Sequence, residues 1–344
     1  MGRTRRPRRR RGRSRPRARR ARLRRHTAPR VRRRPMTDTA PIDMADLPVQ
    51  HPHNPGSPAE ARARFFNSGN AFNIKLPPVP ARVFTEEAAR ALAPDAPTGF
   101  VACDQAEAMA CPFPATTPLM LARYATIAAG ERLACDLVAT GSVWFVIAGT
   151  GETRAGTETL RWGAGDVMLL PGGAVAHVAE SRAVLWSVSN APQLAHDASC
   201  PPAIPVAPVH YPAAEIDRQL AVITASGTNA TTSGLALIFS SDGLEASRNI
   251  LPTLTLSLNT LPPGTDQRAH RHNSAAVTLA VAGERCFSRV DGSRCDWTPW
   301  ATLVTPPGAP HSHHNDGGDR ARFLIVQDGG LHYHARTMGF AFLE

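Results

Sequence analysis

Three histidines in the C-terminal third of the chain have the types and spacing of a metal site. His270 and His272 are one residue apart, and His311 lies thirty-nine residues beyond them. Side chains two positions apart in a strand point to the same face, so His270 and His272 can hold one ion together. A third imidazole from a later strand would complete the site and leave coordination positions open for a substrate. Neutral imidazoles fit zinc as well as iron, with manganese a further alternative, so ligand type alone does not choose the metal.

Glycine and proline residues frame these histidines in two segments. The segments read Gly264-x5-His270-x-His272-x10-Gly283 and Trp300-x5-Pro306-x-Gly308-x2-His311-x3-Asn315. Their spacing resembles the two motifs of the cupin superfamily, G-x5-H-x-H-x3,4-E-x6-G and G-x5-P-x-G-x2-H-x3-N. Two positions differ, because Ala276 replaces the glutamate ligand and Trp300 replaces a glycine. Without that carboxylate the site is one charge unit more positive, which favours an anionic chelating substrate.

The same frame occurs once more upstream, without the ligands. Gly130 and Gly149 have the spacing of the glycines around the first two histidines, and Gly165-x5-Pro171-x-Gly173 repeats the second segment. A repeat of one domain's length indicates two copies of one fold.

Non-ligating residues occupy the histidine positions of this upstream copy. Asp136 and Val138 stand where the first two histidines would be, and Ala176 stands in the third place, with His177 one residue later. One residue later in a strand is the opposite face, so His177 is predicted to be a structural histidine. The first copy is therefore expected to be a structural or dimerising barrel without metal.

Two segments of the second copy resemble a narrower family, the gentisate, salicylate and 1-hydroxy-2-naphthoate dioxygenases. "HRHNSAAVTLAVAG" resembles the family's H-R-H-x3-A-x6-G segment, and "TPPGAPHSHHNDG" resembles its T-P-x-W-x-W-H-D-H-G-N-D-G segment. The resemblance implies a bicupin in which His270, His272 and His311 hold Fe(II), and in which an aromatic substrate reacts with O2.

The same resemblance implies four further site residues. His313 would line the substrate pocket and could serve as a catalytic acid or base near neutral pH. Asn259 falls where the family often has a pocket glutamine, and Asp328 resembles the aspartate of its L-D-G-L segment. Thr278 stands where the family commonly has an arginine that holds the substrate carboxylate, so the substrate contacts are expected to differ there.

Four other polar residues have a weaker case. Arg268 or Arg271 could hold an anion in place of the missing arginine, although a solvated charge is the commoner role for such residues. His332 and His334 form another same-face pair, but no glycine frame surrounds them, so they are expected to stay outside the metal set.

Short apolar runs broken by glycine, proline and aspartate must supply the strands that position these residues. Many such runs without helices between them predict an all-β bicupin with two double-stranded β-helix (jelly-roll) barrels and short helices at the arm and linker. The expected parts are a tail at 1–35, an N-terminal arm at 36–98, a metal-free first barrel at 99–198, a linker at 199–215 and a metal-binding second barrel at 216–344.

Charge is distributed unevenly along the chain. Residues 1–35 hold nineteen arginines and no acid, so the remainder carries 20 basic and 28 acidic side chains. A single lysine among so many arginines indicates a GC-rich gene, and translation outside a gene would yield this composition, so Met36 is expected to be the true start. The alternative is a tail that binds phosphate backbones. No nucleic-acid partner is expected unless the tail is real.

The resemblance, together with the spacing of the three histidines, implies an Fe(II)-dependent, ring-cleaving dioxygenase-like cupin that acts on a hydroxylated aromatic acid or a related small anion. Its partners would be that substrate and O2, and a homo-oligomer is expected. The longest apolar windows are too short for a membrane span, and six cysteines without a CxxC pair favour reduced thiols in the cytoplasm. Two alternatives stay open: a non-catalytic cupin that binds or senses a small molecule, and a manganese or zinc cupin decarboxylase or isomerase.

Overall fold

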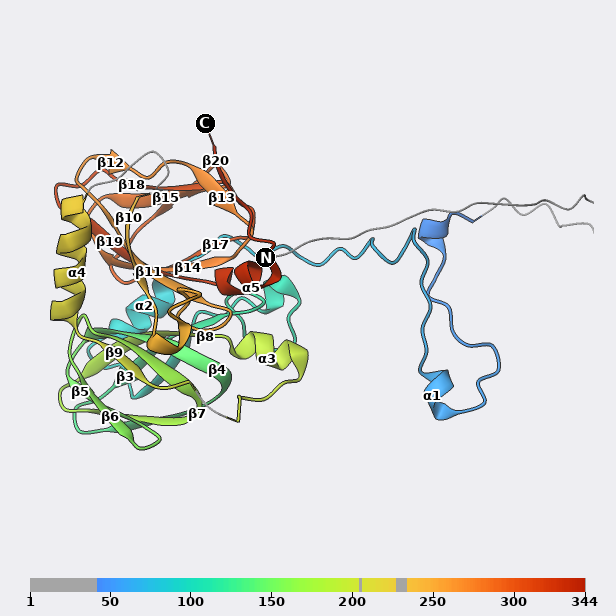
Figure 1. Ribbon diagram of the computed structural model, residues 1–344, viewed down its shortest axis with the longest axis horizontal. Helices are drawn as coiled ribbons and strands as arrows, with labels where there is room; N and C mark the ends of the chain where they lie inside the picture. Colours follow the sequence, from blue (N-terminus) through green and yellow to red (C-terminus); the bar gives the residue numbers. More distant parts are fainter. Residues whose placement is uncertain (1–41, 204–205, 227–233, 344) are drawn as a thin grey trace, which may run out of the picture. The chain divides into compact units, whose positions relative to one another are not determined.

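Figure 1 shows the computed structural model of the chain, which describes residues 42–203, 206–226 and 234–343. The arginine-rich residues 1–35, and with them the expectations about a tail and a start at Met36, lie outside these ranges. The chain divides into two compact units, residues 1–74 and residues 75–344.

The described part of the first unit, residues 42–74, contains two short helical turns, η1 (Met44–Asp46) and α1 (Pro58–Ala61). The hydroxyl of Ser57 caps α1 by accepting a hydrogen bond from the Glu60 N–H at 3.2 Å, and Pro58 occupies the first helical position. A β-bridge pairs Gln50 with Phe65. Helix α1 lies in the N-terminal arm, where the sequence predicts short helices.

One antiparallel sheet of eight strands builds the first barrel. Its order is β2-β3-β8-β4-β7-β5-β6, with β9 paired to β7. The long strands β4 and β7 shift register between Leu137 and Gly141. A Cβ on Gly172 would lie 1.7 Å from the carbonyl oxygen of Ala139, so only glycine fits where the two strands approach. The irregularity bends both strands and folds the sheet around its own core. The strands are β2 (Gly99–Ala102), β3 (Leu121–Ile127), β4 (Arg132–Ala148), β5 (Gly151–Ala155), β6 (Glu158–Trp162), β7 (Val167–Ala179), β8 (Ala183–Ser189) and β9 (Val209–Tyr211).

Two antiparallel sheets build the second barrel, in the orange and red part of Figure 1. One sheet has the order β1-β17-β14-β19-β11-β10, and the other has the order β16-β15-β18-β13-β20, with β12 paired to β18. The strands are β1 (Val83–Phe84), β10 (Leu235–Phe239), β11 (Thr255–Leu261), β12 (Thr265–Asp266), β13 (His270–His272), β14 (Ala276–Ala282), β15 (Cys286–Val290), β16 (Ser293–Asp296), β17 (Thr302–Thr305), β18 (His311–Asn315), β19 (Ala321–Gln327) and β20 (Phe340–Phe342).

Helices are few and short in the second unit. Helix α2 lies in the expected arm and α4 begins in the expected linker, so the prediction of helices in these two parts is confirmed. Within the described ranges, none of the helices is both long and apolar enough to cross a membrane. The helical segments are α2 (Thr85–Leu92), η2 (Glu107–Met109), α3 (Ala191–Asp197), α4 (Ala213–Ser226), η3 (Asp242–Leu244) and α5 (Gly329–Ala335).

A single hydrophobic core joins the two barrels, with Trp186 of β8 and Val304 of β17 among its buried side chains. The hydroxyl of Thr302 accepts the indole N–H of Trp186 at 2.9 Å and lies 2.8 Å from the hydroxyl of Tyr124. These buried polar groups find partners across the two barrels, which holds one face of β17 against the first barrel. Alternation along β17 turns Thr305 to the other face, where it lines a cavity.

Candidate metal centre

The three predicted ligands come together because two strands of one sheet are neighbours. Antiparallel pairing of β13 with β18 sets His270 directly opposite His311, and His272 follows on the same face of β13. The ligand atoms that these three histidines offer lie within 4.8 Å of one another, and all three side chains are buried. The spacing in the sequence therefore predicted the cluster correctly.

Backbone carbonyls determine which nitrogen of each ring is free. The Nδ1 atom of His270 lies 2.9 Å from the Arg268 carbonyl, that of His272 lies 2.8 Å from the Ser274 carbonyl, and that of His311 lies 2.9 Å from the Ala309 carbonyl. A carbonyl can only accept, so each Nδ1 carries the hydrogen and each Nε2 keeps its lone pair. Histidine ligands of metals commonly donate their second N–H in this way.

Burial keeps these rings neutral. It lowers the pKa of His311 to about 3 and the pKa of His272 to about 4, and it lowers the pKa of His270 as well. Each imidazole is therefore unprotonated near pH 7, as metal coordination requires. Three buried neutral rings with converging lone pairs fit a divalent metal ion, and the sheet rather than a flexible loop positions them.

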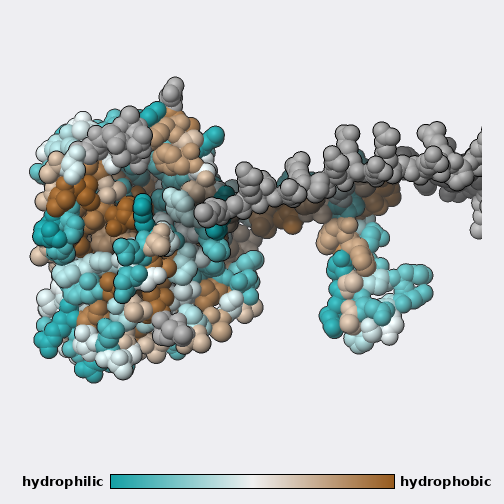
Figure 2. Space-filling model, viewed as in Figure 1, coloured by the Kyte–Doolittle hydropathy of each residue, from teal (hydrophilic) through white to brown (hydrophobic). Residues whose placement is uncertain are grey.

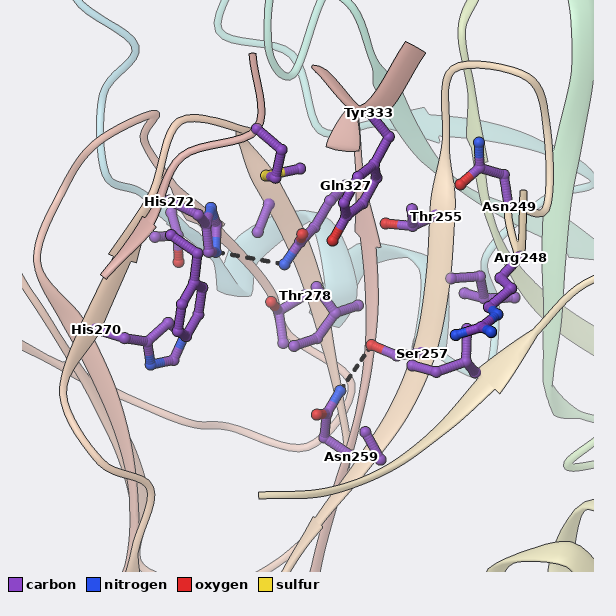
Figure 3. Close-up of a pocket in the computed structure, with 18 of the residues that line it drawn as sticks. Arg248, Asn249, Thr255, Ser257, Asn259, His270, His272, Thr278, Gln327 and Tyr333 are labelled. Atoms are coloured by element: carbon purple, nitrogen blue, oxygen red, sulfur yellow. Dashed lines mark hydrogen bonds between the residues drawn. The ribbon is translucent and has the colours of Figure 1, made fainter. Parts of the chain in front are cut away.

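A cavity of about 590 Å³ opens beside the three histidines, and Figure 3 shows most of its wall. In Figure 2, hydrophobic surface gathers over the part of the second barrel that contains β10 and β11. Apolar residues from five strands and from the segment between α5 and β20 make up much of the wall: Ala236, Ile238, Leu256, Ala276, Ile325, Met338 and Phe340. A cavity of this size, apolar with a few polar groups, suits a small molecule that carries a ring.

The structure brings three of the four other predicted site residues to this cavity. Asn259, Thr278 and His313 line it. The amide Nδ2 of Asn259 donates to the Ser257 hydroxyl at 2.8 Å. The hydroxyl of Thr278 is buried and has no hydrogen-bond partner among the described residues. It is therefore available to a bound molecule.

Asp328, the fourth predicted residue, is not among the described residues that line the cavity. Its side chain is buried just after β19, where Oδ1 accepts a hydrogen bond from the Ala275 N–H at 2.8 Å. Desolvation raises the pKa of this carboxyl to about 7. The structure thus gives Asp328 a contact that anchors the start of β14.

Sequence reasoning missed Gln327. This residue pairs across the sheet with Ala276, the residue in the glutamate position, and its Nε2 lies 3.4 Å from Nε2 of His272 (Figure 3). No motif covers β19, so only the strand register could have revealed the contact. A neutral amide thus lies beside a predicted metal ligand, next to the position where the cupin motif has a glutamate.

His313 is held in the opposite tautomer to the three ligands. Its Nδ1 lies 2.7 Å from the Ser288 hydroxyl, and that hydroxyl accepts the indole N–H of Trp297 at 2.9 Å. Among the described residues, the hydroxyl hydrogen of Ser288 has no other acceptor than Nδ1 of His313, so Nε2 must carry the ring hydrogen. His313 therefore offers an N–H donor in the cavity wall, while the ligands offer lone pairs. Burial and the neighbouring histidines lower the pKa of His313, so the ring is neutral.

The first barrel contains the same arrangement without the metal ligands. Thr153 replaces Ser288, with its hydroxyl 2.7 Å from Nδ1 of His177 and 2.9 Å from the indole nitrogen of Trp162. His177 is fully buried, and burial lowers its pKa to about 3. His177 is thus the counterpart of His313, and the prediction that it lies on the opposite face is wrong.

The physical reason is a difference of one residue between the copies. Gly173 precedes His177 by four residues, whereas Gly308 precedes His313 by five, so the shared frame shifts by one residue within β7, after Gly173. Asp136 and Val138, which stand at the ligand positions in the sequence, are both exposed on β4. The interior face of the first barrel carries apolar residues and His177 instead.

The other polar residues weighed in the sequence lie outside the cavity. The guanidinium of Arg268 packs 4.2 Å from the ring centroid of Phe342, and Arg271 is exposed on β13. His332 and His334 do not form a same-face pair, because they lie in α5, where residues two apart point to different sides of the helix.

Comparison with known proteins agrees with this geometry. The family described as "Cupin domain" matches residues 257–327, which contain β11 to β19 and all three histidines. This part of the second barrel is therefore similar to a cupin domain. The gentisate 1,2-dioxygenase of Ralstonia sp is 35% identical over 79 residues, and the gentisate 1,2 dioxygenase 1 of Aquipseudomonas alcaligenes is 34% identical over 93 residues. These alignments cover 23% and 27% of this chain, and only 22% and 26% of the two relatives.

Solved structures extend the likeness to both barrels. A salicylate 1,2-dioxygenase from Pseudaminobacter salicylatoxidans superposes with a TM-score of 0.63 at 14% identity, covering 81% of this chain and 92% of that chain. The same enzyme in its adduct with gentisate gives a TM-score of 0.64 at 13% identity, covering 79% and 87%. The predicted all-β fold with two cupin barrels is confirmed.

We predict that the two hydroxyls which bridge a tryptophan and a histidine stabilise their barrels alike. Ser288→Ala and Thr153→Val each leave a buried indole N–H and a buried ring nitrogen without a partner, which costs about 1–3 kcal/mol. Urea unfolding should show this loss for both variants and little change for Ser293→Ala, an exposed control on β16. An unchanged stability in either bridge variant would contradict the assignment.

A second prediction concerns the buried Asp328 carboxyl. Its folded pKa of about 7 lies above its ordinary value of 3.8, so between these pH values the folded state binds a proton that the unfolded state lacks. Its contribution to stability is thus present below about pH 4 and is lost as the pH rises to about 7. Asp328→Asn keeps an acceptor for the Ala275 N–H and cannot ionise, so its stability should not decrease over this pH range.

Unfolding free energies of the metal-free protein at pH 5, 6, 7 and 8 test the sign. Relative to wild type, Asp328→Asn should gain about 1 kcal/mol or more between pH 5 and pH 8. The histidines contribute equally to both proteins and cancel in the difference. Parallel pH profiles would mean that the carboxyl does not titrate in this range.

Proposed function

We propose that the protein is an Fe(II)-dependent dioxygenase that cleaves the ring of a hydroxylated aromatic acid with O2. The observation that carries the proposal is the three-histidine cluster at the wall of a largely apolar cavity, within the segment that matches the cupin family, in a chain that is similar over 79 residues to a gentisate dioxygenase. Iron is favoured over zinc and manganese by that likeness, since the ligand set alone fits all three. Bound iron would supply the redox chemistry that lets O2 react with an electron-rich ring.

The protein's own residues bind and orient the substrate. His313 donates a hydrogen bond from its Nε2–H to a substrate oxygen, which stabilises negative charge that develops on that oxygen during the reaction. The free hydroxyl of Thr278 and the amide of Asn259 provide further polar contacts. Apolar walls such as those of Ile325 and Phe340 pack against the ring and exclude water.

The two barrels then have different roles. The second barrel holds the metal and the substrate, and the first barrel supports it through their common hydrophobic core. We include in the proposal that the protein works as a homo-oligomer in the cytoplasm.

Metal analysis and oxygen uptake test the proposal together. The wild type should bind one iron per chain and consume O2 with gentisate, salicylate or 1-hydroxy-2-naphthoate. His270→Ala, His272→Ala and His311→Ala should each lose tightly bound iron and all oxygen uptake, because each removes one of three ligands. His314→Ala is the matched control, since this histidine lies on the same strand but contacts Asp266 outside the cluster.

Two results would contradict the proposal in different ways. Iron retained at one equivalent after any ligand substitution would refute the site. Iron bound by the wild type without oxygen uptake on any of the three acids would refute the reaction and favour a binding protein or another metal chemistry.

A further inference from the structure

The described wall of the cavity contains one arginine, Arg248, and no lysine, aspartate or glutamate. The three histidines are neutral, and no carboxylate of this wall balances the charge of a bound divalent ion or of the guanidinium. Arg248 is exposed, so water reaches its guanidinium when the cavity holds no ligand. A ligand that displaces this water and carries negative charge would balance both the guanidinium and a bound divalent ion.

Arg248 is held by a tight turn between η3 and β11. Its backbone is left-handed, with φ 57°, and its N–H donates to the Leu244 carbonyl at 2.9 Å. Asn249 and Ile250, which follow it, are buried. The base of the arginine side chain is thus fixed. The left-handed backbone is not itself a sign of function, since Arg285 has φ 54° and lines no described cavity wall.

The guanidinium faces the cavity rather than a protein carboxylate. Figure 3 shows the Arg248 side chain reaching toward Ser257, on the side of the cavity opposite His270 and His272. Asp242 and Glu245 line a neighbouring groove together with Arg248, but neither forms an ion pair with it. Its hydrogen-bond donors remain available for a ligand.

We infer that Arg248 forms an anion subsite that binds the carboxylate of the substrate at the end of the cavity away from the histidines. A guanidinium pairs with a carboxylate through two parallel hydrogen bonds, which gives direction as well as charge. The site then holds an acidic molecule between the metal and Arg248. The inference rests on the proposed function in taking that molecule to be an aromatic acid.

Ligand binding without turnover tests the subsite. Calorimetry on the zinc-loaded protein, free of O2, would compare salicylate with salicylamide, which has the same ring and hydroxyl but no charge. The variants are Arg248→Met and Arg248→Lys, and Arg285→Met is the control with the same backbone conformation.

Arg248→Met should weaken salicylate binding tenfold or more and leave salicylamide binding within about twofold. Arg248→Lys should fall between wild type and Arg248→Met, because a lysine keeps the charge but loses the paired hydrogen bonds. Arg285→Met should bind both compounds like wild type. Unaltered salicylamide affinity also shows that the variant cavity is intact.

Equal salicylate affinity in wild type and Arg248→Met would overturn the inference, as would a wild type that binds none of salicylate, gentisate and 1-hydroxy-2-naphthoate. A different result would contradict the proposed function and leave the anion subsite standing. A protein that shows the selective loss for salicylate but consumes no O2 when loaded with iron would keep the anion subsite and lose the dioxygenase activity.

Discussion

The antiparallel pairing of β13 with β18 is the constraint on which the site depends. It puts His270 opposite His311 and leaves His272 one step along the same face, so three imidazoles meet inside the barrel without any loop having to close. The carbonyl that each ligand ring bonds through Nδ1 lies only two residues away in the chain. Strand geometry therefore decides both where the rings lie and which nitrogen they present. A metal ion would find its ligands already oriented, with little ordering left to oppose binding.

Burial and hydrogen bonding then divide the cavity into acceptors and donors. Desolvation lowers the pKa of each ligand histidine, so lone pairs are present at neutral pH. Ser288 and Trp297 hold His313 in the other tautomer, so a ring two residues from a ligand offers an N–H instead. The repetition of this hydroxyl bridge around His177 indicates that it belongs to the barrel itself. The second barrel uses the same structural element at the wall of a cavity.

Motif spacing correctly predicted the features that depend on which face of a strand a residue occupies. It did not predict the features that depend on the register between strands or on segments far away in the sequence. The histidine pair, the glycine frame and the short strands led directly to the cluster and to two β-barrels. The sequence predicts the wrong face for His177 because the first copy lacks one residue within β7, after Gly173, and no periodicity reveals such a deletion. His332 and His334 were read as strand residues although they lie in α5. Gln327 and Arg248 reach the cavity from segments without a motif, so only the folded chain identifies them.

The fold alone fixes the histidine tautomers that make a metal site. Long-range 1H–15N correlation spectra of the metal-free protein at pH 7, labelled with 15N-histidine and assigned by single substitutions, measure this directly. We predict that His270, His272 and His311 carry their ring hydrogen on Nδ1 and that His313 carries it on Nε2. A hydrogen on Nε2 of any of the three ligands, or rapid exchange between the two tautomers, would contradict it.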